Sequence, residues 1–559
     1  MPRISVHSPS FSRRRRVEKP ALRSKGGVVV SQNRVAATIG AEVLKAGGNA
    51  VDAAVATGLA MGIVEPWMSG IGGVGVALVA LPGGAVEAFD FGGVSPFGLD
   101  PADYPLIEGK ASDMFGWPAV KEDRNLKGAK SVAVPSHLAG LFALHAAHGT
   151  MPWADLVAPA QKLAAEGLVV DWYATVMIAN AFADLLADAG SRGWFLPNGV
   201  PPGQPMQTSG TLARLPNARL AATLAQIGKE GIAPFYRGEI AESLVRDVQA
   251  AGGCLAREDF ERYSVRRVAP QAIAYAGRRI HVLPELNGGP TLAAAFSRLP
   301  VTPPSEDAAL FLGYADALDF AWKDRFAKLG HKGDLGHKGD LGHKGDLGHK
   351  GDLGHRSDAG FAPERAPTST THLSVVDRNG MAITLTQTLL TAFGARFVAP
   401  TSGIALNNGI NWFDPRPGSV NAIAPGVRVL ANFCPAIMTG RNRAGVDETV
   451  AIGGAGGRKI IPAVFQLLAL MVDRGLDLEA AFAAPRLDHS AGSKIVADER
   501  LGEAVLAALE AHHPLVTALP NPAPYPFTIA SAVSRTSGVN CGMTDIEHPW
   551  SEAVGEDEV

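Results

Sequence analysis

Residues 371–390, THLSVVDRNGMAITLTQTLL, contain the pattern that most restricts how this chain can fold. Two runs of alternating, largely β-branched side chains flank Asp377-Arg378-Asn379-Gly380, and an Asn-Gly pair in that position is the strongest short-range signal of a β-hairpin. Apolar runs on either side of Pro82-Gly83-Gly84 predict a second hairpin within residues 70–91. The fold must therefore contain antiparallel strand pairs in both halves of the chain.

The remaining segments alternate between strand and helix. A short strand is expected at 28–31, then a helix over 33–46 that ends at Gly47-Gly48, then a helix from Asn49. Helical periodicity dominates 136–255, and strand character returns at 268–283. Further strands are expected at 403–407 and 429–438, and a strand through 453–457 leads into a helix. Strands covered by helices predict a layered α+β architecture.

The charge balance excludes one class of partner. The chain has 51 Lys and Arg against 54 Asp and Glu, which excludes a nucleic-acid or membrane binder driven by net charge. The longest apolar run, residues 50–64, contains Asp52 and is too short to span a bilayer, so it predicts a buried helix. Arg13 to Arg16 are followed by no apolar stretch of signal-peptide length. We therefore expect a cytoplasmic protein, with the periplasm as the alternative.

Residues 330–353 are four copies of the hexapeptide GHKGDL, followed by the partial copy Gly354-His355-Arg356. A six-residue period with paired glycines has no apolar helical face, so the repeat, 330–355, predicts a surface loop without a catalytic role. Metal binding by its histidines is the alternative. The loop interpretation is preferred because one imidazole every six residues offers no preorganised second ligand.

Several segments are together similar to the γ-glutamyltranspeptidase family of N-terminal-nucleophile hydrolases. They are GGNAVDAAVATGLAMGIVEPWMSGIGG (47–73), VAVPSHLAGL (132–141), GTMPWADLVAPAQKLAAEGLVV (149–170), STTHLSVVDRNG (369–380), SGIALNN (402–408) and GGAGGRKI (453–460). The resemblance implies a four-layer αββα sandwich formed jointly by two fragments of one precursor. A basic leader, 1–27, that need not be ordered would precede a large fragment, 28–369, and a small fragment, 370–559. The fragments would form a heterodimer that acts on a small-molecule amide without a cofactor or metal.

The resemblance also implies where the chemistry lies. Cleavage between Ser369 and Thr370 would free an α-amine whose pKa is near 8, so Thr370 would supply both the nucleophile and its base. Thr388 would be the second hydroxyl that orients this amine. Gly456 and Gly457 would form the oxyanion hole, because backbone amides of a Gly-Gly turn can approach an oxyanion closely. The alternative for Thr370 alone is an ordinary strand start, and GGAGGRK does not meet the phosphate-loop spacing.

The sequence departs from the family where the γ-glutamyl group is recognised. Members of the family hold its α-carboxylate and α-ammonium with an arginine, an asparagine, paired aspartates and a Ser-Ser pair. We refer to the corresponding positions of this chain as the clamp positions, and none of them keeps the family residue. They are Gly92 for the arginine, Leu390 for the asparagine, Asn411 and Trp412 for the aspartates, and Ala431 and Asn432 for the serines.

These changes favour the cephalosporin acylase branch of the family. That branch removes a glutaryl-type acyl group from the amino group of the 7-aminocephalosporanic acid nucleus, and some γ-glutamyl transfer or hydrolysis is expected beside it. Arg396 and Arg428 are candidates for binding the terminal carboxylate of the acyl group. One alternative is a γ-glutamyltranspeptidase that hydrolyses glutathione. An alternative of another class is an uncleaved, inactive binding protein.

Overall fold

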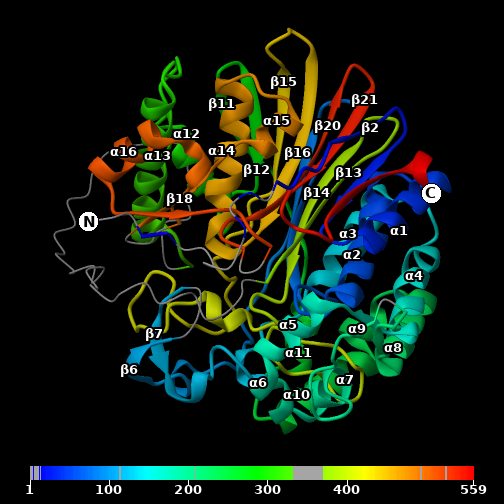
Figure 1. Cartoon of the computed structure of the whole chain (residues 1–559). Helices are drawn as coiled ribbons and strands as arrows, with labels where there is room; N and C mark the ends of the chain where they lie inside the picture. Colours follow the sequence, from blue (N-terminus) through cyan, green and yellow to red (C-terminus); the bar gives the residue numbers. More distant parts are fainter. Residues whose placement is uncertain are drawn as a thin grey trace.

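A computed structural model describes residues 4, 5, 12, 14, 16–111, 115–207, 209–331, 369–490, 494–522 and 525–559. Its centre is a pair of seven-stranded antiparallel sheets (Figure 1). The first sheet has the order β10 (Arg266–Val268), β5 (Val86–Phe91), β4 (Val74–Ala80), β14 (Ala382–Thr388), β13 (Thr371–Val376), β3 (Val28–Ser31) and β22 (Glu552–Gly555). The second has the order β11 (Gln271–Tyr275), β12 (Arg278–Val282), β15 (Ala436–Arg441), β16 (Asp447–Ala455), β20 (Ile529–Thr536), β21 (Val539–Thr544) and β2 (Leu22–Ser24).

Helices cover the outer face of each sheet (Figure 1). Against the first sheet lie α1 (Arg34–Lys45), α2 (Ala50–Val64) and α3 (His137–His148). Against the second lie α12 (Gly289–Phe296), α14 (Ile460–Asp473) and α15 (Leu478–Ala483), with α13 (Asp307–Lys328) and α16 (Glu503–His512) beside them. Further helices extend the first side: α4 (Trp153–Glu166), α5 (Trp172–Asn180), α6 (Phe182–Ala187), α7 (Ala189–Phe195), α8 (Ala218–Glu230), α9 (Ala233–Arg237), α10 (Glu239–Ala250) and α11 (Arg257–Arg262).

The buried apolar residues form three clusters, one at each interface between layers. Strand β3 shows how alternation divides them: Val28 and Val30 belong to the cluster between the sheets, whereas Val29 belongs to the cluster under α1 and α2. A strand buried on both faces needs apolar residues at every position, which explains the continuous valine run. The fold is thus the four-layer αββα sandwich of the N-terminal-nucleophile hydrolases, as expected.

Local signals in the sequence account for the elements nearest the site. The Asn33 side chain caps α1 by accepting from the Val35 amide at 3.0 Å, and Asn49 caps α2 in a capping box with Asp52. In the predicted 371–390 hairpin, the Asp377 carboxylate accepts from the amide of Asn379 at 2.9 Å and closes the turn. Both predicted hairpins are confirmed, as β13–β14 and β4–β5.

Two predicted strands are wrong in extent. Residues 403–407 contain only isolated bridges at Ala405 and Leu406, and β15 begins at Ala436 rather than at 429. The apolar side chains of both segments are buried, but their amides bind loop carbonyls. The Ala431 amide, for example, donates to Leu286 O at 3.0 Å. Burial alone therefore produced an apolar pattern that resembles a strand.

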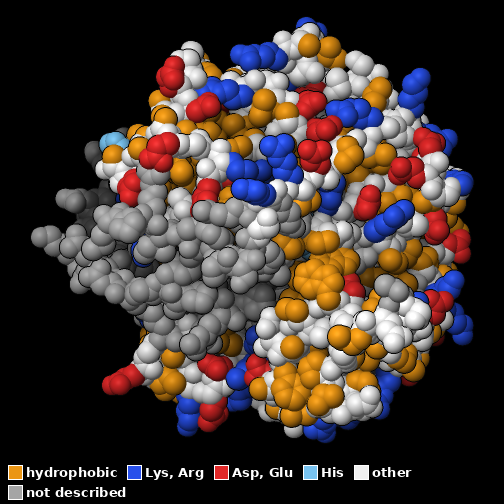
Figure 2. Space-filling view, in the orientation of Figure 1, with side chains coloured by type: hydrophobic (Ala, Val, Ile, Leu, Met, Phe, Trp, Pro, Cys, Tyr) orange, Lys and Arg blue, Asp and Glu red, His pale blue; other side chains and the backbone are white. Residues whose placement is uncertain are grey.

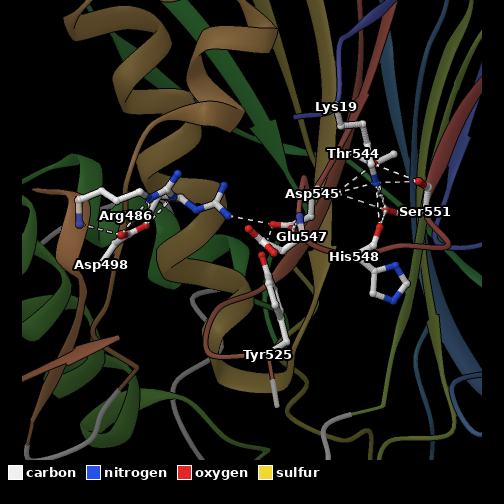
Figure 3. Close-up of polar contacts among 10 residues, drawn as sticks. Lys19, Arg486, Asp498, Tyr525, Thr544, Asp545, Glu547, His548 and Ser551 are labelled. Atoms are coloured by element: carbon white, nitrogen blue, oxygen red, sulfur yellow. Dashed lines mark hydrogen bonds and ion pairs between the residues drawn. The ribbon is translucent and has the colours of Figure 1, made fainter. Parts of the chain in front are cut away.

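The last part of the expected leader, 1–27, is ordered. Leu22–Ser24 forms β2, which pairs with β21 at the edge of the second sheet. Before it, the Lys19 ammonium lies within 2.8–3.0 Å of five oxygens of the C-terminal segment, from Thr544, Asp545, His548 and Ser551 (Figure 3). These contacts attach the leader to the C-terminal segment. Most of the hexapeptide repeat, from residue 332 on, lies outside the described residues.

The described surface shows no dominant sign of charge on the face drawn in Figure 2, where Lys and Arg alternate with Asp and Glu. This pattern agrees with the near balance of 51 basic and 54 acidic residues. In the part of the chain that the structure describes, no helix has both the length and the apolar character that a membrane span requires.

Replacing Lys19 by Met should lower the stability of the folded protein. The substitution removes the shared donor of three backbone carbonyls, at Asp545, His548 and Ser551, and an unsatisfied buried acceptor costs about 1–3 kcal/mol. Thermal unfolding measures the effect, with Lys25→Met at an exposed position as the matched control. Equal melting temperatures for the two variants would show that the Lys19 contacts are not structural.

Glu65, at the end of α2, should make stability depend on pH. Burial raises the pKa of its carboxyl from 4.5 to about 8, although Asn33 donates to it at 3.3 Å. Between pH 4.5 and 8 the carboxyl ionises in the unfolded chain but stays protonated in the folded one, so stability falls as pH rises through this window. Glu65→Gln should therefore gain melting temperature over wild type at pH 8 but not at pH 4.5. Glu42→Gln, at an exposed position of α1, is the control. An equal gain in melting temperature for Glu65→Gln at both pH values would contradict the raised pKa of Glu65.

Candidate active site

The peptide bond between Ser369 and Thr370 lies inside the protein. Ser369 is fully buried and Thr370 is 5% exposed. The Ser369 amide donates to Leu390 O at 3.3 Å, and its hydroxyl donates to Trp67 O at 2.6 Å and Met68 O at 2.7 Å. The residue before the predicted nucleophile is thus held by both its amide and its side chain.

Two hydroxyls meet the carbonyl oxygen of Ser369. Thr388 Oγ1 donates to it at 2.6 Å, and Thr370 Oγ1 donates to it as well. The two hydroxyl oxygens are 3.3 Å apart. This arrangement can polarise the carbonyl, and it holds the Thr370 hydroxyl beside the same carbonyl group.

Strand register and close backbone packing bring these groups together. Thr371 lies opposite Gln387 in the β13–β14 ladder, so Thr370 reaches Thr388 just beyond it. The Leu390 amide donates to Thr388 Oγ1 at 2.8 Å and thereby directs the Thr388 proton toward Ser369. At Gly73 a Cβ atom would lie 2.5 Å from Thr388 O, so only glycine permits this approach. The structure therefore brings together Ser369, Thr370 and Thr388 as predicted.

The Gly456-Gly457 turn ends the neighbouring strand of the second sheet. Gly456 has φ +151° and Gly457 has φ +61°, conformations that favour glycine. Thr384 Oγ1 on β14 donates to Ile452 O on β16 at 3.1 Å. Two residues further along β14, Thr386 lies opposite His372, and the His372 ring lies against Gly453, the next residue of β16. The two strands therefore run toward the same end, where Thr388 and the glycine turn both lie. Amides at the start of the following helix have no acceptor within it and are available to an oxyanion.

His372 is the imidazole nearest to Thr370 along the chain, but it is a core residue. Its ring nitrogens bind the hydroxyls of Thr386 at 2.9 Å and of Ser374 and Thr384 at 3.1 Å. Burial lowers the pKa of His372 to about 3, so the ring is neutral at neutral pH. Because both nitrogens are occupied by hydroxyls within the sheets, His372 is not arranged as the base for Thr370.

Three clamp positions are apolar and share one cluster. Leu390, Trp412 and Ala431 all belong to the core between the two sheets, with exposures of 3%, 4% and 1%. Leu390 has φ +88°, a conformation that asparagine adopts more readily than leucine. The Trp412 ring packs against Phe433 at 5.8 Å between centroids. Leu390, whose amide binds Thr388, therefore belongs to a hydrocarbon cluster that also contains Trp412 and Ala431.

At Gly92, where the family has an arginine, the guanidinium of Arg428 from a later part of the chain lies nearby. A Cβ atom at this position would lie 3.7 Å from Arg428 Nη1, which donates to Gly92 O at 2.9 Å. Asp90 lies 3.4 Å from the same guanidinium and 3.7 Å from Arg266, which in turn pairs with Glu285 at 2.7 Å. Two cations and two anions thus neutralise one another here.

Neither the carboxylate candidate Arg396 nor the clamp position Asn411, which stands for one of the family's aspartates, offers a free charge. Arg396 pairs with Asp184 of α6 at 3.4 Å and is committed to that helix. Asn411 is fully buried, and its backbone carbonyl accepts from Trp117 Nε1 at 3.2 Å. Its side-chain Nδ2 has no acceptor among the described residues. Neither Arg396 nor Asn411 presents a charge to the site.

Sequence reasoning did not identify Arg325 on α13, which contacts the clamp positions directly. Its guanidinium is 3% exposed and donates to Ala431 O at 2.8 Å and to Asn432 Oδ1 at 3.0 Å. In the sequence this residue looks like part of a solvated charged face. The available signal was its helical spacing from Ala321 and Trp322, which places it on the buried side of α13.

Comparisons with known proteins agree with this geometry. The Gamma-glutamyltranspeptidase family profile matches residues 36–553. Glutathione hydrolase 2 of Arabidopsis thaliana is 30% identical over 83% of this chain and 80% of that protein, and the Acylase ACY 1 proenzyme of Pseudomonas sp. (strain V22) is 31% identical over 88% and 87%. The fold matches the crystal structure of cephalosporin acylase from Bacillus halodurans with a TM-score of 0.80 at 23% identity, over 99% of both chains. The chain belongs to the gamma-glutamyltranspeptidase family.

Proposed function

We propose that this chain cleaves itself before Thr370 and then hydrolyses amides of ω-carboxyacyl groups, glutaryl amides of a cephalosporin nucleus being the representative substrate. One observation carries the proposal. The apolar cluster at Leu390, Trp412 and Ala431 adjoins an intact Ser369–Thr370–Thr388 arrangement. The chemistry of acyl transfer is retained, while the polar groups that hold an amino acid are replaced.

Self-cleavage follows from the hydrogen bonds at Ser369. Thr370 Oγ1 attacks the Ser369 carbonyl carbon while Thr388 Oγ1 donates to the carbonyl oxygen. The C–N bond breaks as the C–O bond forms, so Ser369 becomes esterified to the Thr370 hydroxyl and the Thr370 nitrogen takes the hydroxyl proton. Water then hydrolyses the ester, which leaves a carboxylate on Ser369 and a free amine on Thr370.

In turnover the same hydroxyl attacks the carbonyl carbon of the substrate amide. The Thr370 amine accepts the hydroxyl proton and passes it to the departing amine of the nucleus, while the amides of Gly456 and Gly457 stabilise the oxyanion. Water hydrolyses the resulting ester and releases the dicarboxylate. An amine that arrives before water takes the acyl group instead, which accounts for some transferase activity.

The apolar cluster disfavours a γ-glutamyl substrate because its α-ammonium would be buried without a partner. Removing one member of a buried ion pair costs about 3–5 kcal/mol. Leu390 and Ala431 offer neither charge nor side-chain hydrogen bonds, and the Trp412 indole packs against Phe433. The similarity to the Acylase ACY 1 proenzyme supports this assignment.

A glutathione hydrolase is the second candidate, and one observation favours it. Arg428 lies beside Gly92, where it can approach an α-carboxylate, and the similarity to Glutathione hydrolase 2 is equally extensive. Asp90 already neutralises Arg428, however, and none of the three apolar positions supplies a partner for an ammonium. We therefore rank this function second.

Purified wild-type protein should separate into fragments of 369 and 190 residues on a denaturing gel, since 559 − 369 = 190. Thr370→Ala should remain one chain, because it lacks the attacking hydroxyl. Thr388→Val should slow cleavage about 100-fold, since removing one donor to an oxyanion typically has that effect. Thr386→Val, whose hydroxyl binds His372 instead, is the matched control. Uncleaved wild type with full activity would refute self-cleavage. Uncleaved wild type without activity would favour the alternative of an inactive binding protein.

The wild-type enzyme should hydrolyse a glutaryl anilide at least tenfold faster, in kcat/KM, than the matched γ-glutamyl anilide. Leu390→Asn should raise kcat/KM for the γ-glutamyl compound and lower it for the glutaryl compound, because the amide offers hydrogen bonds and suits φ +88°. Leu390→Met, which keeps the site apolar, is the control. A wild-type preference for the γ-glutamyl anilide by tenfold or more would assign the protein to the glutathione hydrolases.

A further inference from the structure

Arg325 is a buried cation without a nearby anion. Its guanidinium donates to four neutral acceptors, and among the described residues no carboxylate forms an ion pair with it. The acceptors are Asn287 O at 3.0 Å, Thr291 Oγ1 at 3.2 Å, Ala431 O at 2.8 Å and Asn432 Oδ1 at 3.0 Å. These bonds occupy both terminal nitrogens of the guanidinium, but no carboxylate among the described residues compensates its charge.

The other two arginines considered for this role are neutralised by the protein itself. Arg428 is paired with Asp90 at 3.4 Å, and Arg396 with Asp184 at 3.4 Å. A substrate carboxylate at either one would have to compete with a carboxylate already present. Arg325 should attract an incoming anion more strongly than Arg428 or Arg396 does. A buried charge without a counter-ion is costly, so pairing it with an anion is favourable.

A second positive charge increases this effect. Burial lowers the pKa of Arg325, and the charge of Arg458, directly after Gly457, lowers it further. The Arg458 guanidinium lies over the rings of Phe115 at 5.1 Å and Trp117 at 5.5 Å. Arg458 therefore lies close enough to Arg325 for the two positive charges to repel each other.

Arg325 also fixes the orientation of Asn432. Because an arginine can only donate, the Asn432 atom that it contacts is the carbonyl oxygen, so the amide nitrogen points elsewhere as a donor. Within the described chain Asn432 Nδ2 has no acceptor, and it is not among the fully buried unsatisfied atoms. The nitrogen is therefore an accessible donor next to an uncompensated cation.

We propose that Arg325, through its charge and through the Asn432 amide that it orients, recognises the terminal carboxylate of the acyl group. The inference rests on the proposed function, because it names the residue that selects an ω-carboxyacyl substrate. It also explains how a pocket with apolar walls at Leu390, Trp412 and Ala431 can prefer a charged acyl chain. The walls exclude an ammonium, while the positive end attracts a carboxylate.

The test compares a glutaryl anilide with the pentanoyl anilide, which has the same chain length and no carboxylate. In wild type the ratio of the two kcat/KM values should exceed 100, and in Arg325→Met it should fall at least tenfold. Arg325→Lys, which keeps the charge, should retain a larger ratio than Arg325→Met. Arg278→Met is the matched control, because Arg278 is also a buried arginine but pairs with Glu448 at 2.9 Å. A ratio that stays unchanged in Arg325→Met would overturn the proposal.

A second variant keeps the test valid if Arg325→Met does not fold. Asn432→Asp supplies Arg325 with a carboxylate from the protein, so it should raise the melting temperature and lower the glutaryl-to-pentanoyl ratio at least tenfold. A lower melting temperature with an unchanged ratio would show that the Arg325 charge needs no anion and would overturn the proposal.

A binding measurement separates this inference from the proposed function. Glutarate should raise the melting temperature of wild type more than pentanoate does, and Arg325→Met should abolish the difference. If wild type hydrolyses no glutaryl anilide but glutarate still binds through Arg325, the proposed function is wrong and the carboxylate site stands. If the glutaryl anilide is hydrolysed but glutarate stabilises both proteins equally, the proposed function stands and the role of Arg325 is wrong.

Discussion

The hydrogen bond from Thr388 Oγ1 to the carbonyl of Ser369, at 2.6 Å, is the interaction around which the site is organised. It requires β13 and β14 to be in register, and it requires Gly73 to lie against Thr388 without a side chain. Both sheets contain strands from either side of residue 369, so a break in the chain there would divide neither sheet. The fold can therefore tolerate cleavage at the point where the chemistry needs a free amine.

The site combines a retained mechanism with a changed recognition surface. In the proposed mechanism, acyl transfer uses the hydroxyl and the freed amine of Thr370, the Thr388 hydroxyl and the amides of the glycine turn. Under the proposal, substrate choice depends on the clamp positions, three of which lie in the apolar cluster between the sheets, and on Arg325, which binds Asn432. A buried guanidinium can hold a carboxylate at some distance from the nucleophile without a neighbouring ammonium site.

The sequence predicted the parts of this site that depend on local patterns. The hairpin of residues 371–390 follows from its Asn-Gly turn, and the layered fold follows from the order of strands and helices. The contact of Arg325 with Asn432 joins residues 107 positions apart, and no periodicity links them. The irregular segments at 403–407 and 429–435 were mistaken for strands because their side chains are buried while their amides bind loops. Long-range pairing of loops is the information that a single sequence lacks.

The central claim is that Thr370 carries a glutaryl group during turnover. The most direct measurement is the mass of each fragment of an enzyme that is acid-quenched during reaction with a glutaryl amide, followed by peptide mapping. The account predicts one glutaryl group on the small fragment, attached to its first residue, Thr370. Turnover without an adduct on Thr370, or an adduct on the large fragment, would contradict it.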